Sequence, residues 1–416
     1  MTELLTLDIE SIAAGGDGVA RHDGLVVFVP RSAPGDRVVA RVTKKGRLAR
    51  GVVERIERAS PQRIEAACPH YEGDHCGGCQ LQHLSIAAQR SARQRIVADT
   101  FRRVGKRVVA LPELVAGERT WRYRQKLTMA LRCEKGTWRA GLHQFDDPER
   151  VFALHDCLIA DERLIGVWRD ILAAAAHLPR VDRLRGSVRL LDDGSSCAAF
   201  VLEGGRRWSA HAEFFDRTPS LGALWWIPDG GTRRMLHDRR PGAARAEPGA
   251  SFAQVNGEMA PRLAAFIGEA VMAHAPATVV DAYAGAGEVA VALAARGVRV
   301  TAIELDPEAS AACAARLGAR SRSVIGRVED ALGAALPADV VILNPPRAGV
   351  DARVTARLAS DASVRGIVYV SCDPATLARD VARLPAWRVA RLTAFDMFPQ
   401  TAHVETVCEL VPDAAP

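Results

Sequence analysis

The 416-residue sequence contains no long apolar run, and this absence removes one class of protein at the outset. No window approaches the roughly 18 consecutive apolar residues of a membrane-spanning helix, so we expect no membrane segment. The first ten residues, MTELLTLDIE, include acids and lack the apolar core of a signal peptide. Internal repeats and low-complexity tracts are also missing. Together these absences predict a cytoplasmic globular protein.

Cysteine is scarce and odd in number, with nine residues in a chain that lacks a secretory signal. This usage argues against a disulfide framework and favours thiols kept reduced for metal binding or catalysis. With 48% hydrophobic and 25% charged residues the chain can build packed cores. Its length exceeds what one core supports, so we expect two or three domains.

The net charge of +6 is distributed unevenly along the chain. From Ala250 onward there are 15 Lys and Arg against 18 Asp and Glu, so the first 249 residues carry +9. Residues Arg90 to Lys126 alone hold 11 basic and 3 acidic side chains. This asymmetry favours a part that holds nucleic acid joined to a part that performs chemistry, with a generic Arg-rich surface as the alternative.

Turn residues and hydrophobic periodicity divide the sequence into three predicted domains. Residues 1–58 alternate apolar and polar positions between glycine turns, which predicts a small β-barrel, and Arg37 to Arg50 adds six basic residues without an acid. Residues 59–249 read as a mixed α+β domain, and the stretch around Pro248 is the expected boundary to residues 250–416.

Within the middle domain, Leu84 to Val104 has helical spacing, and we expect its arginines on the outer face. The predicted strands of this domain are Lys126–Arg132, Ser187–Leu191 and Cys197–Leu202.

The last part of the chain alternates strands with helices. The segment TVVDAYAGAGEVAVALAARG reads as strand, glycine-rich turn and helix, and VRVTAIELDP, ADVVILNPPRAG and RGIVYVSCDP add further strands. This order predicts an α/β fold with a doubly wound, mostly parallel sheet.

The glycine-rich turn carries a candidate cofactor site. Gly285 and Gly287 allow a ligand to approach the backbone at a helix start, and Glu304 ends the next strand at the spacing of a ribose-binding carboxylate. NAD or S-adenosylmethionine would satisfy these features. The dinucleotide fingerprint needs a third glycine, and Ala290 is the nearest candidate, so S-adenosylmethionine fits better. The turn at Asn344, followed by two prolines, presents a rigid backbone to a planar base.

A set of cysteines in the middle domain has metal-ligand spacing. Cys76 and Cys79 form a C-x2-C pair, with Cys68 before it and Cys157 far along the chain. Four thiolates can hold a zinc ion or a four-iron cluster, and spacing alone leaves both open. Nearby alternative ligands are His70, His75, His83 and His155.

Cys372 ends the apolar run Ile367–Val370, and Pro374 is suited to start a helix directly after it. The cysteine is thus predicted at the carboxyl end of a strand, the edge at which open α/β sheets bind ligands, and a helix N-terminus favours a thiolate. His403 and Glu405 lie two apart on a strand-like run, so we expect them to share a face. A buried core cysteine and a solvated edge-strand carboxylate are the alternatives without function.

Taken together, these segments resemble the RNA 5-methyluridine methyltransferases, and most closely the 23S ribosomal RNA branch that carries an iron–sulfur cluster. The segments in family order are CGGCQLQH, YRQK, FAQVN, DAYAGAG, IELDP, NPPRAG, VYVSCDPATLARD and FPQTAHVETV, and residues 1–58 resemble the RNA-binding barrel called TRAM. The resemblance implies a class I methyltransferase fold and a middle iron–sulfur domain, in a cytoplasmic monomer that methylates RNA. It makes Cys372 the nucleophile and Glu405 the base. It also implies S-adenosylmethionine contacts from Gln254, Tyr283, Glu304 and Asn344, and [4Fe-4S] ligation by Cys68, Cys76, Cys79 and Cys157.

Two features depart from the family pattern. The family usually has Asp at the position of Asn344, and the first cysteine gap, C-x7-C, is longer than expected. The alternatives kept beside 23S ribosomal RNA are a transfer RNA substrate, a cytosine C5 target and a non-catalytic RNA-binding factor.

Overall fold

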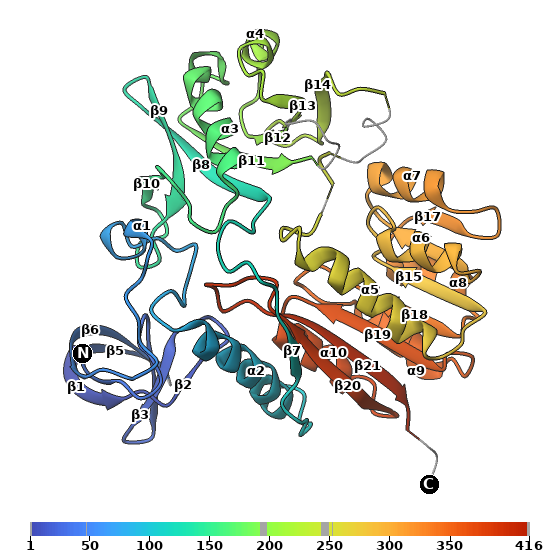
Figure 1. The fold of residues 1–416 in the computed structure, drawn as a ribbon, viewed down its shortest axis with the longest axis horizontal. Coiled ribbons are helices and arrows are strands. Elements are labelled where there is room, and N and C mark those ends of the chain that lie inside the picture. Colours follow the sequence, from blue (N-terminus) through green and yellow to red (C-terminus); the bar gives the residue numbers. More distant parts are fainter. Residues whose placement is uncertain (1, 47, 192–197, 243–248, 252, 414–416) are drawn as a thin grey trace. The chain divides into compact units, whose positions relative to one another are not determined.

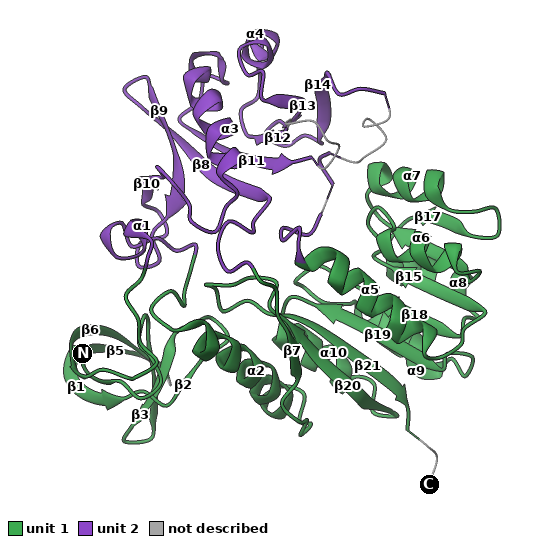
Figure 2. Ribbon diagram, in the orientation of Figure 1, with its two compact units in different colours: residues 1–66, 79–118, 259–416 green, residues 67–78, 119–258 purple. Residues whose placement is uncertain are grey.

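The computed structural model describes residues 2–46, 48–191, 198–242, 249–251 and 253–413, so Arg47, Cys197 and Pro248 lie outside the described residues. Figure 1 shows the fold, and by compactness the chain divides into two units, which Figure 2 colours separately. Unit 1 comprises Met1–Ala66, Cys79–Glu118 and Met259–Pro416, and unit 2 comprises Ala67–Gly78 and Arg119–Glu258. The three-domain division 1–58, 59–249 and 250–416 stays a prediction.

The N-terminal part of unit 1 is a six-stranded sheet in the order β1-β5-β6-β4-β3-β2. Its strands are β1 Thr2–Asp8, β2 Ser11–Ile12, β3 Gly18–His22, β4 Leu25–Val29, β5 Arg37–Lys45 and β6 Leu48–Arg58. Alternate positions such as Leu7, Val27 and Val38 turn inward and form one core, as the sequence alternation predicts. The sequence predicts a small β-barrel here, and the structure shows a six-stranded sheet with one core.

The rest of unit 1 is an eight-stranded sheet in the order β17-β16-β15-β18-β19-β21-β20-β7. Its strands are β7 Glu113–Val115, β15 Thr278–Ala282, β16 Arg299–Glu304, β17 Arg322–Ile325, β18 Val340–Leu343, β19 Gly366–Ser371, β20 Trp387–Phe395 and β21 Glu405–Pro412. Strands β15 to β19 are parallel, while β21 runs antiparallel between β19 and β20. The predicted doubly wound, mostly parallel sheet is confirmed, and β7 is an additional strand that the sequence did not indicate.

Helices cover both faces of this sheet (Figure 1). The first face is covered by α2 Ile86–Arg103, α8 Val328–Ala335, α9 Ala352–Ser360 and α10 Pro374–Ala382. The second is covered by α5 Met259–Met272, α6 Glu288–Ala295 and α7 Pro307–Arg316. Because every central strand is buried on two sides, its residues are almost all apolar.

Helix α2 confirms the helical spacing seen in the sequence, with Ser85 as its N-cap accepting a hydrogen bond from the Ala88 N–H at 3.3 Å. The expectation that all its arginines face outward is wrong, because the side chain of Arg93 is fully buried. Its guanidinium donates to Asp396 Oδ1 at 2.7 Å, a partner 303 residues away that helical periodicity cannot reveal.

Unit 2 is built on a seven-stranded, mostly antiparallel sheet in the order β10-β9-β8-β11-β12-β13-β14. Its strands are β8 Lys126–Glu134, β9 Thr137–His143, β10 Val151–Ala153, β11 Arg183–Leu190, β12 Ala198–Glu203, β13 Leu221–Ile227 and β14 Arg234–Asp238. Its helices are α1 Pro69–Gly73, α3 Glu162–Ala173, a 3-10 turn Ala175–His177 and α4 His211–Asp216. In the described parts of both units, we find no helix with the length and hydrophobicity needed to cross a bilayer.

Candidate active site

Cys372 lies where the sequence places it, between the end of β19 and the start of α10. Pro374 occupies the first turn of α10, and the Asp373 side chain caps it by accepting hydrogen bonds from the N–H groups of Ala375 and Thr376. Cys372 is half-buried. This position is the carboxyl edge of the parallel strands, where such sheets bind ligands.

Glu405 begins β21 and lies beside Cys372. Ser371 pairs with Thr406 in the antiparallel ladder, and continuing that register sets position 372 opposite Glu405. Glu405 is 3% exposed and β21 is an inner strand, which rules out a solvated edge-strand carboxylate. The expectation that His403 shares its face is wrong, because His403 is exposed in the loop before β21 begins.

The electrostatics of this pair oppose ionisation of both groups. Burial raises the pKa of Glu405 to about 8. The pKa of the Cys372 thiol is also raised, first by burial and then by the charge of Glu405. The net shift at Cys372 is therefore upward, although a helix N-terminus is expected to favour the thiolate. Arg347 is the cation that favours both anions. Its positive charge lowers the pKa of Cys372 and of Glu405, and its side chain also forms a hydrogen bond with the Cys372 thiol.

Arg347 lies on the loop that follows β18, and Asp380 of α10 forms a hydrogen bond with the backbone of this loop. The carboxylate of Asp380 is fully buried and accepts hydrogen bonds from the Tyr369 hydroxyl at 2.8 Å and the Val350 N–H at 2.9 Å. Arg379 adds a donor to the same carboxylate and also bonds Ala348 O. Arg347 lies in the segment NPPRAG and Asp380 in VYVSCDPATLARD, but nothing in the sequence pattern indicates a role for either residue.

In the structure the Glu304 carboxylate is hydrogen bonded to the backbone of the glycine-rich turn. Gly285 N–H donates to Glu304 Oε2 at 2.8 Å, and Asp306 N–H donates to Oε1 at 2.7 Å. Tyr283, Gly285 and Gly287 all have positive φ, of 63°, 57° and 85°. A Cβ at Gly285 would meet nothing within 4 Å, so open space lies beside the turn and suits a ligand that contacts the backbone.

The two remaining residues predicted to hold the cofactor belong to different units. Asn344 directly follows β18, is half-buried, and its N–H donates to Ala282 O at 3.2 Å in the strand that leads to the glycine-rich turn. Gln254 is half-buried in unit 2. The structure therefore groups Tyr283, Glu304 and Asn344 at one sheet edge in unit 1.

The four cysteines proposed as metal ligands fall on either side of a unit boundary. Cys68, Cys76 and Cys157 belong to unit 2, and Cys79 is the first residue of the next segment of unit 1. Burial raises the pKa of Cys157, and the charge of Cys68 contributes in the same direction, so these two thiols interact. Gly78 N–H donates to Cys76 Sγ at 3.4 Å. None of the eight cysteines within the described ranges is in a disulfide.

Two of the histidines named as alternative ligands pair with carboxylates. His70 pairs with Asp74 at 2.7 Å and His75 with Asp146 at 2.5 Å. His83 is 1% exposed, and burial together with Arg63 lowers its pKa to about 4. Among the residues that the structure describes, no three or more His, Cys, Asp or Glu side chains stand in an arrangement that could hold a metal ion.

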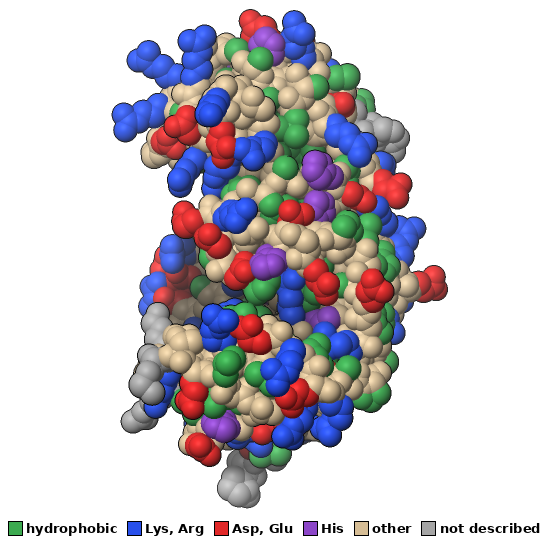
Figure 3. All heavy atoms as spheres, turned by 90° about the vertical axis from the view of Figure 1, so that its left-hand side faces the viewer, with side chains coloured by type: hydrophobic (Ala, Val, Ile, Leu, Met, Phe, Trp, Pro, Cys, Tyr) green, Lys and Arg blue, Asp and Glu red, His purple; other side chains and the backbone are tan. Residues whose placement is uncertain are grey.

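Cations of the N-terminal sheet are mostly matched by acids from neighbouring strands. Arg37 pairs with Asp8 at 3.2 Å and Arg41 with Glu54 at 2.7 Å. Figure 3 shows the same interspersion of basic and acidic side chains across one face of the molecule. Exposed pairs of this kind contribute only about 0–1 kcal/mol, so a phosphate group can compete for these arginines.

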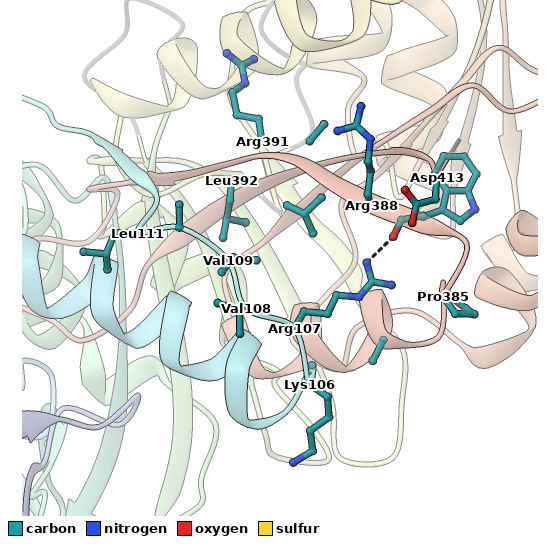
Figure 4. A pocket seen from close by; sticks show the side chains of 16 residues that line it. Lys106, Arg107, Val108, Val109, Leu111, Pro385, Arg388, Arg391, Leu392 and Asp413 are labelled. Atoms are coloured by element: carbon teal, nitrogen blue, oxygen red, sulfur yellow. Dashed lines mark hydrogen bonds between the residues drawn. The ribbon is translucent and has the colours of Figure 1, made fainter. Parts of the chain in front are cut away.

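A cavity of about 730 Å³ opens between residues 105–111 and β20 (Figure 4). Arg107 crosses it and hydrogen bonds to Trp387 O and Leu384 O, while Arg388 and Arg391 project from β20. Trp387 pairs with Pro412 at the end of β21 opposite to Glu405. The cavity therefore lies at the opposite end of β20 and β21 from Glu405 and Cys372. None of the predicted site residues lines it.

The fold and the glycine-rich turn point to one class of enzyme. A parallel sheet with one reversed inner strand, and a glycine-rich turn with an acid on the next strand, are features of α/β methyltransferases.

Comparison with known proteins identifies the family. Residues 243–411 match the family model described as tRNA (Uracil-5-)-methyltransferase, and residues 3–51 match the TRAM domain. The chain is 32% identical, over 98% of its length and 89% of the relative, to the 23S rRNA (uracil(1939)-C(5))-methyltransferase RlmD of Chromohalobacter salexigens. It is 30% identical, over 98% of its length and 97% of the relative, to an uncharacterized RNA methyltransferase of Halalkalibacterium halodurans.

A solved structure agrees at the level of the fold. The tRNA (uracil-54, C5)-methyltransferase of Pyrococcus abyssi, in complex with S-adenosyl-L-homocysteine, superposes with a TM-score of 0.67 at 21% identity, covering 98% of this chain and 100% of that one. The chain belongs to the RNA uracil-C5 methyltransferase family with a TRAM domain. It is an S-adenosylmethionine-dependent enzyme that methylates C5 of uracil in RNA.

Proposed function

We propose that the enzyme methylates a uracil of 23S ribosomal RNA through a covalent bond to Cys372, with Glu405 removing the C5 proton. The observation that carries the roles is the pairing of a half-buried thiol with a buried carboxyl across β19 and β21, close enough for Glu405 to raise the pKa of Cys372. Arg347 counteracts this effect on the thiol. The RNA assignment is supported by the relative named as a 23S rRNA methyltransferase, which aligns over 98% of this chain.

In the first step Cys372 reacts as the thiolate, after its proton has passed to solvent, and its sulfur adds to C6 of the uracil ring. The electron pair of the C5–C6 double bond moves toward the C4 carbonyl, and C5 becomes nucleophilic. S-adenosylmethionine supplies the methyl group that C5 then takes. Tyr283, the turn of Gly285 and Gly287, Glu304 and Asn344 would hold this cofactor, together with Gln254 of unit 2. Covalent catalysis divides one difficult substitution into easier steps.

The last step restores the aromatic base. Glu405, as a carboxylate, takes the remaining C5 proton, the C5–C6 double bond reforms, and the bond between C6 and the Cys372 sulfur breaks. A carboxyl with a pKa near 8 is a stronger base than an ordinary glutamate, which suits removal of a carbon-bound proton. The target base is expected to be flipped out of its stack to reach the thiol, with RNA held mostly through phosphates.

The test uses 5-fluorouracil-substituted 23S ribosomal RNA with S-adenosylmethionine. Fluorine at C5 cannot leave as a proton, so the enzyme should remain attached to the methylated RNA in a denaturation-resistant adduct that Cys372→Ala abolishes. Mapping the trapped nucleotide identifies the site. An adduct with transfer RNA alone reassigns the substrate, and one with 5-fluorocytosine-containing RNA reassigns the base. Absence of any adduct refutes covalent catalysis.

We also propose that Cys68, Cys76, Cys79 and Cys157 hold a [4Fe-4S] cluster that fastens the middle of the chain and takes no part in methyl transfer. Among the described residues the four thiols are not gathered into a ligand group, so the support is the donor set itself: four cysteines, of which Cys76, Cys79 and Cys157 are each less than one-tenth exposed. Iron and sulfide content of anaerobically purified protein tests it. Cys157→Ser should lose the bound iron, and Cys133→Ser, at a half-buried free cysteine in unit 2, should retain it. Equal iron in both variants contradicts the proposal.

A further inference from the structure

The loop from Asp396 to Val404 leads directly into Glu405, and its middle residue has an unusual backbone. Gln400 has φ +71°, a left-handed conformation that side chains other than glycine and asparagine adopt rarely, at a cost of about 1–2 kcal/mol. It is also only 2% exposed. A buried residue keeps such a conformation only where its surroundings determine it, and this is frequent at functional sites.

Hydrogen bonds from the segment before α2 and from α2 itself hold Gln400 in this conformation. The carbonyl of Gln400 accepts hydrogen bonds from the N–H groups of Gln80 and Leu81 at 3.2 and 3.0 Å. The Gln400 N–H donates to Gln89 Oε1, and Gln89 Nε2 donates to Gln400 Oε1, both at 2.9 Å. Gln89 is fully buried, so this reciprocal amide pair is shielded from competing water.

One turn further along α2, Arg93 holds the loop on either side of Gln400. Its guanidinium donates to Asp396 Oδ1 at 2.7 Å and to Thr401 O at 2.8 Å, and Arg90 reaches Asp396 Oδ2 at 2.8 Å. Arg93 and Asp396 are both buried. Breaking such a pair by removing one partner costs about 3–5 kcal/mol, so Arg93 is a poor place for a functional test and Gln89 a better one.

The loop before Glu405 also packs against residues of the N-terminal sheet and its connecting loop. Ala402 shares a small core with Ile12 of β2, with Ala33 of the loop between β4 and β5, and with Leu81 and Ala92 from the segment that includes α2. The loop before Glu405 is thus fixed by residues outside the sheet that carries Cys372. Cys372 instead lies at the junction of β19 and α10, where Arg347 hydrogen bonds to its thiol.

We propose that Gln89 and Gln400 are positioning residues that aim the Glu405 carboxylate at the C5 proton. The inference rests on the proposed function, in which Glu405 is the base. It separates two steps: thiol addition depends on Cys372, and proton removal depends on the loop that α2 holds. Displacing a catalytic group by about 1 Å can cost roughly a hundredfold in rate.

The test variant is Gln89→Met, which keeps the side-chain length and removes both hydrogen bonds to Gln400. It also removes the hydrogen bond from Gln89 Nε2 to Leu84 O at 3.0 Å, which lies within the α2 segment. The matched control is Gln94→Met on the same helix, whose half-buried side chain bonds Pro112 O at 2.9 Å instead. Single-turnover methylation is followed with RNA carrying hydrogen or deuterium at the uracil C5. Thiol addition is followed separately by adduct formation with 5-fluorouracil RNA.

For Gln89→Met we expect product release slowed at least tenfold, a methylated covalent adduct that accumulates with ordinary RNA, and a primary isotope effect at C5. Adduct formation with 5-fluorouracil RNA should stay within about twofold of wild type, and Gln94→Met should behave as wild type throughout. Gln400→Gly permits the left-handed backbone and removes only the side-chain half of the pair, so it replaces Gln89→Met if that variant does not fold.

Glu405→Gln separates failure of this inference from failure of the proposed function. If Glu405→Gln releases product at the wild-type rate, the base is wrong and the proposed function falls. If Glu405→Gln accumulates the adduct but Gln89→Met does not, the positioning role is overturned. It is also overturned if Gln89→Met slows adduct formation and product release equally, because a general loss of structure would do that.

Discussion

Glu405→Gln should make the protein more stable, and the gain should depend on pH. Burial raises the pKa of Glu405 from an ordinary 4.5 to about 8, so the folded chain holds a proton that the unfolded chain releases in that window. Folded wild type therefore loses stability as the pH rises from 4.5 through 8. Glutamine has the same shape as the protonated acid and carries no proton to lose, so the variant escapes this loss.

The size of the gain follows from the two pKa values. Each pH unit between them is worth about 1.4 kcal/mol, so Glu405→Gln should gain at most about 1 kcal/mol at pH 5, about 3 at pH 7 and about 5 above pH 8. Denaturant unfolding of both proteins at these pH values measures the difference. Glu409→Gln, on the same strand, loses the ion pair of Glu409 with Arg391 at 2.5 Å and should be destabilised instead.

The same unfolding curves can refute the electrostatic reasoning. A constant difference between Glu405→Gln and wild type from pH 5 to pH 8.5 would mean that Glu405 ionises as an ordinary surface glutamate does. Its burial would then not tune it as a base.

Three further outcomes are expected. Arg347→Gln removes the cation that lowers the pKa of Cys372, so iodoacetamide alkylation of this thiol should require a higher pH, measured by mass spectrometry in C372-containing peptides. Gly285→Ala places a methyl group in open space at φ 57°, so it should cost only about 1 kcal/mol of stability yet raise the Kd for S-adenosylmethionine at least tenfold by calorimetry. Asp380→Asn weakens the buried bonds below the Arg347 loop and should lower the unfolding free energy by about 1–3 kcal/mol in denaturant titration, with normal cofactor affinity contradicting a role in holding that loop.

Local patterns predict local structure at this site. The β-branched run before Cys372 and the proline after it are sufficient to place the thiol between a strand and a helix, because both signals act within a few residues. The spacing from the glycine-rich turn to Glu304 also predicts their proximity, because two consecutive parallel strands end at the same edge of the sheet. The hydrogen bond from Gly285 N–H to Glu304 Oε2 is the consequence.

The remaining features depend on distant partners. Glu405 looks like an edge-strand residue in sequence, and only the insertion of β21 between β19 and β20 buries it. Arg93 looks like an exposed helix residue, and its partner Asp396 is supplied 303 residues later. No periodicity carries this information, because the energy of these contacts comes from tertiary burial.

Unit 1 is made of three separate stretches of chain, and this has a consequence for how the protein is synthesised. On the ribosome, α2 and β7 emerge before the whole of Arg119–Glu258, while their partners Asp396, Gln400 and β20 emerge near the end. At about 5–20 residues per second, the apolar side of α2 with Val97 and Phe101 waits roughly 15–60 s for its partners. During that interval unit 2 can complete its own core, so the nascent chain presents an exposed apolar helix that a chaperone would bind.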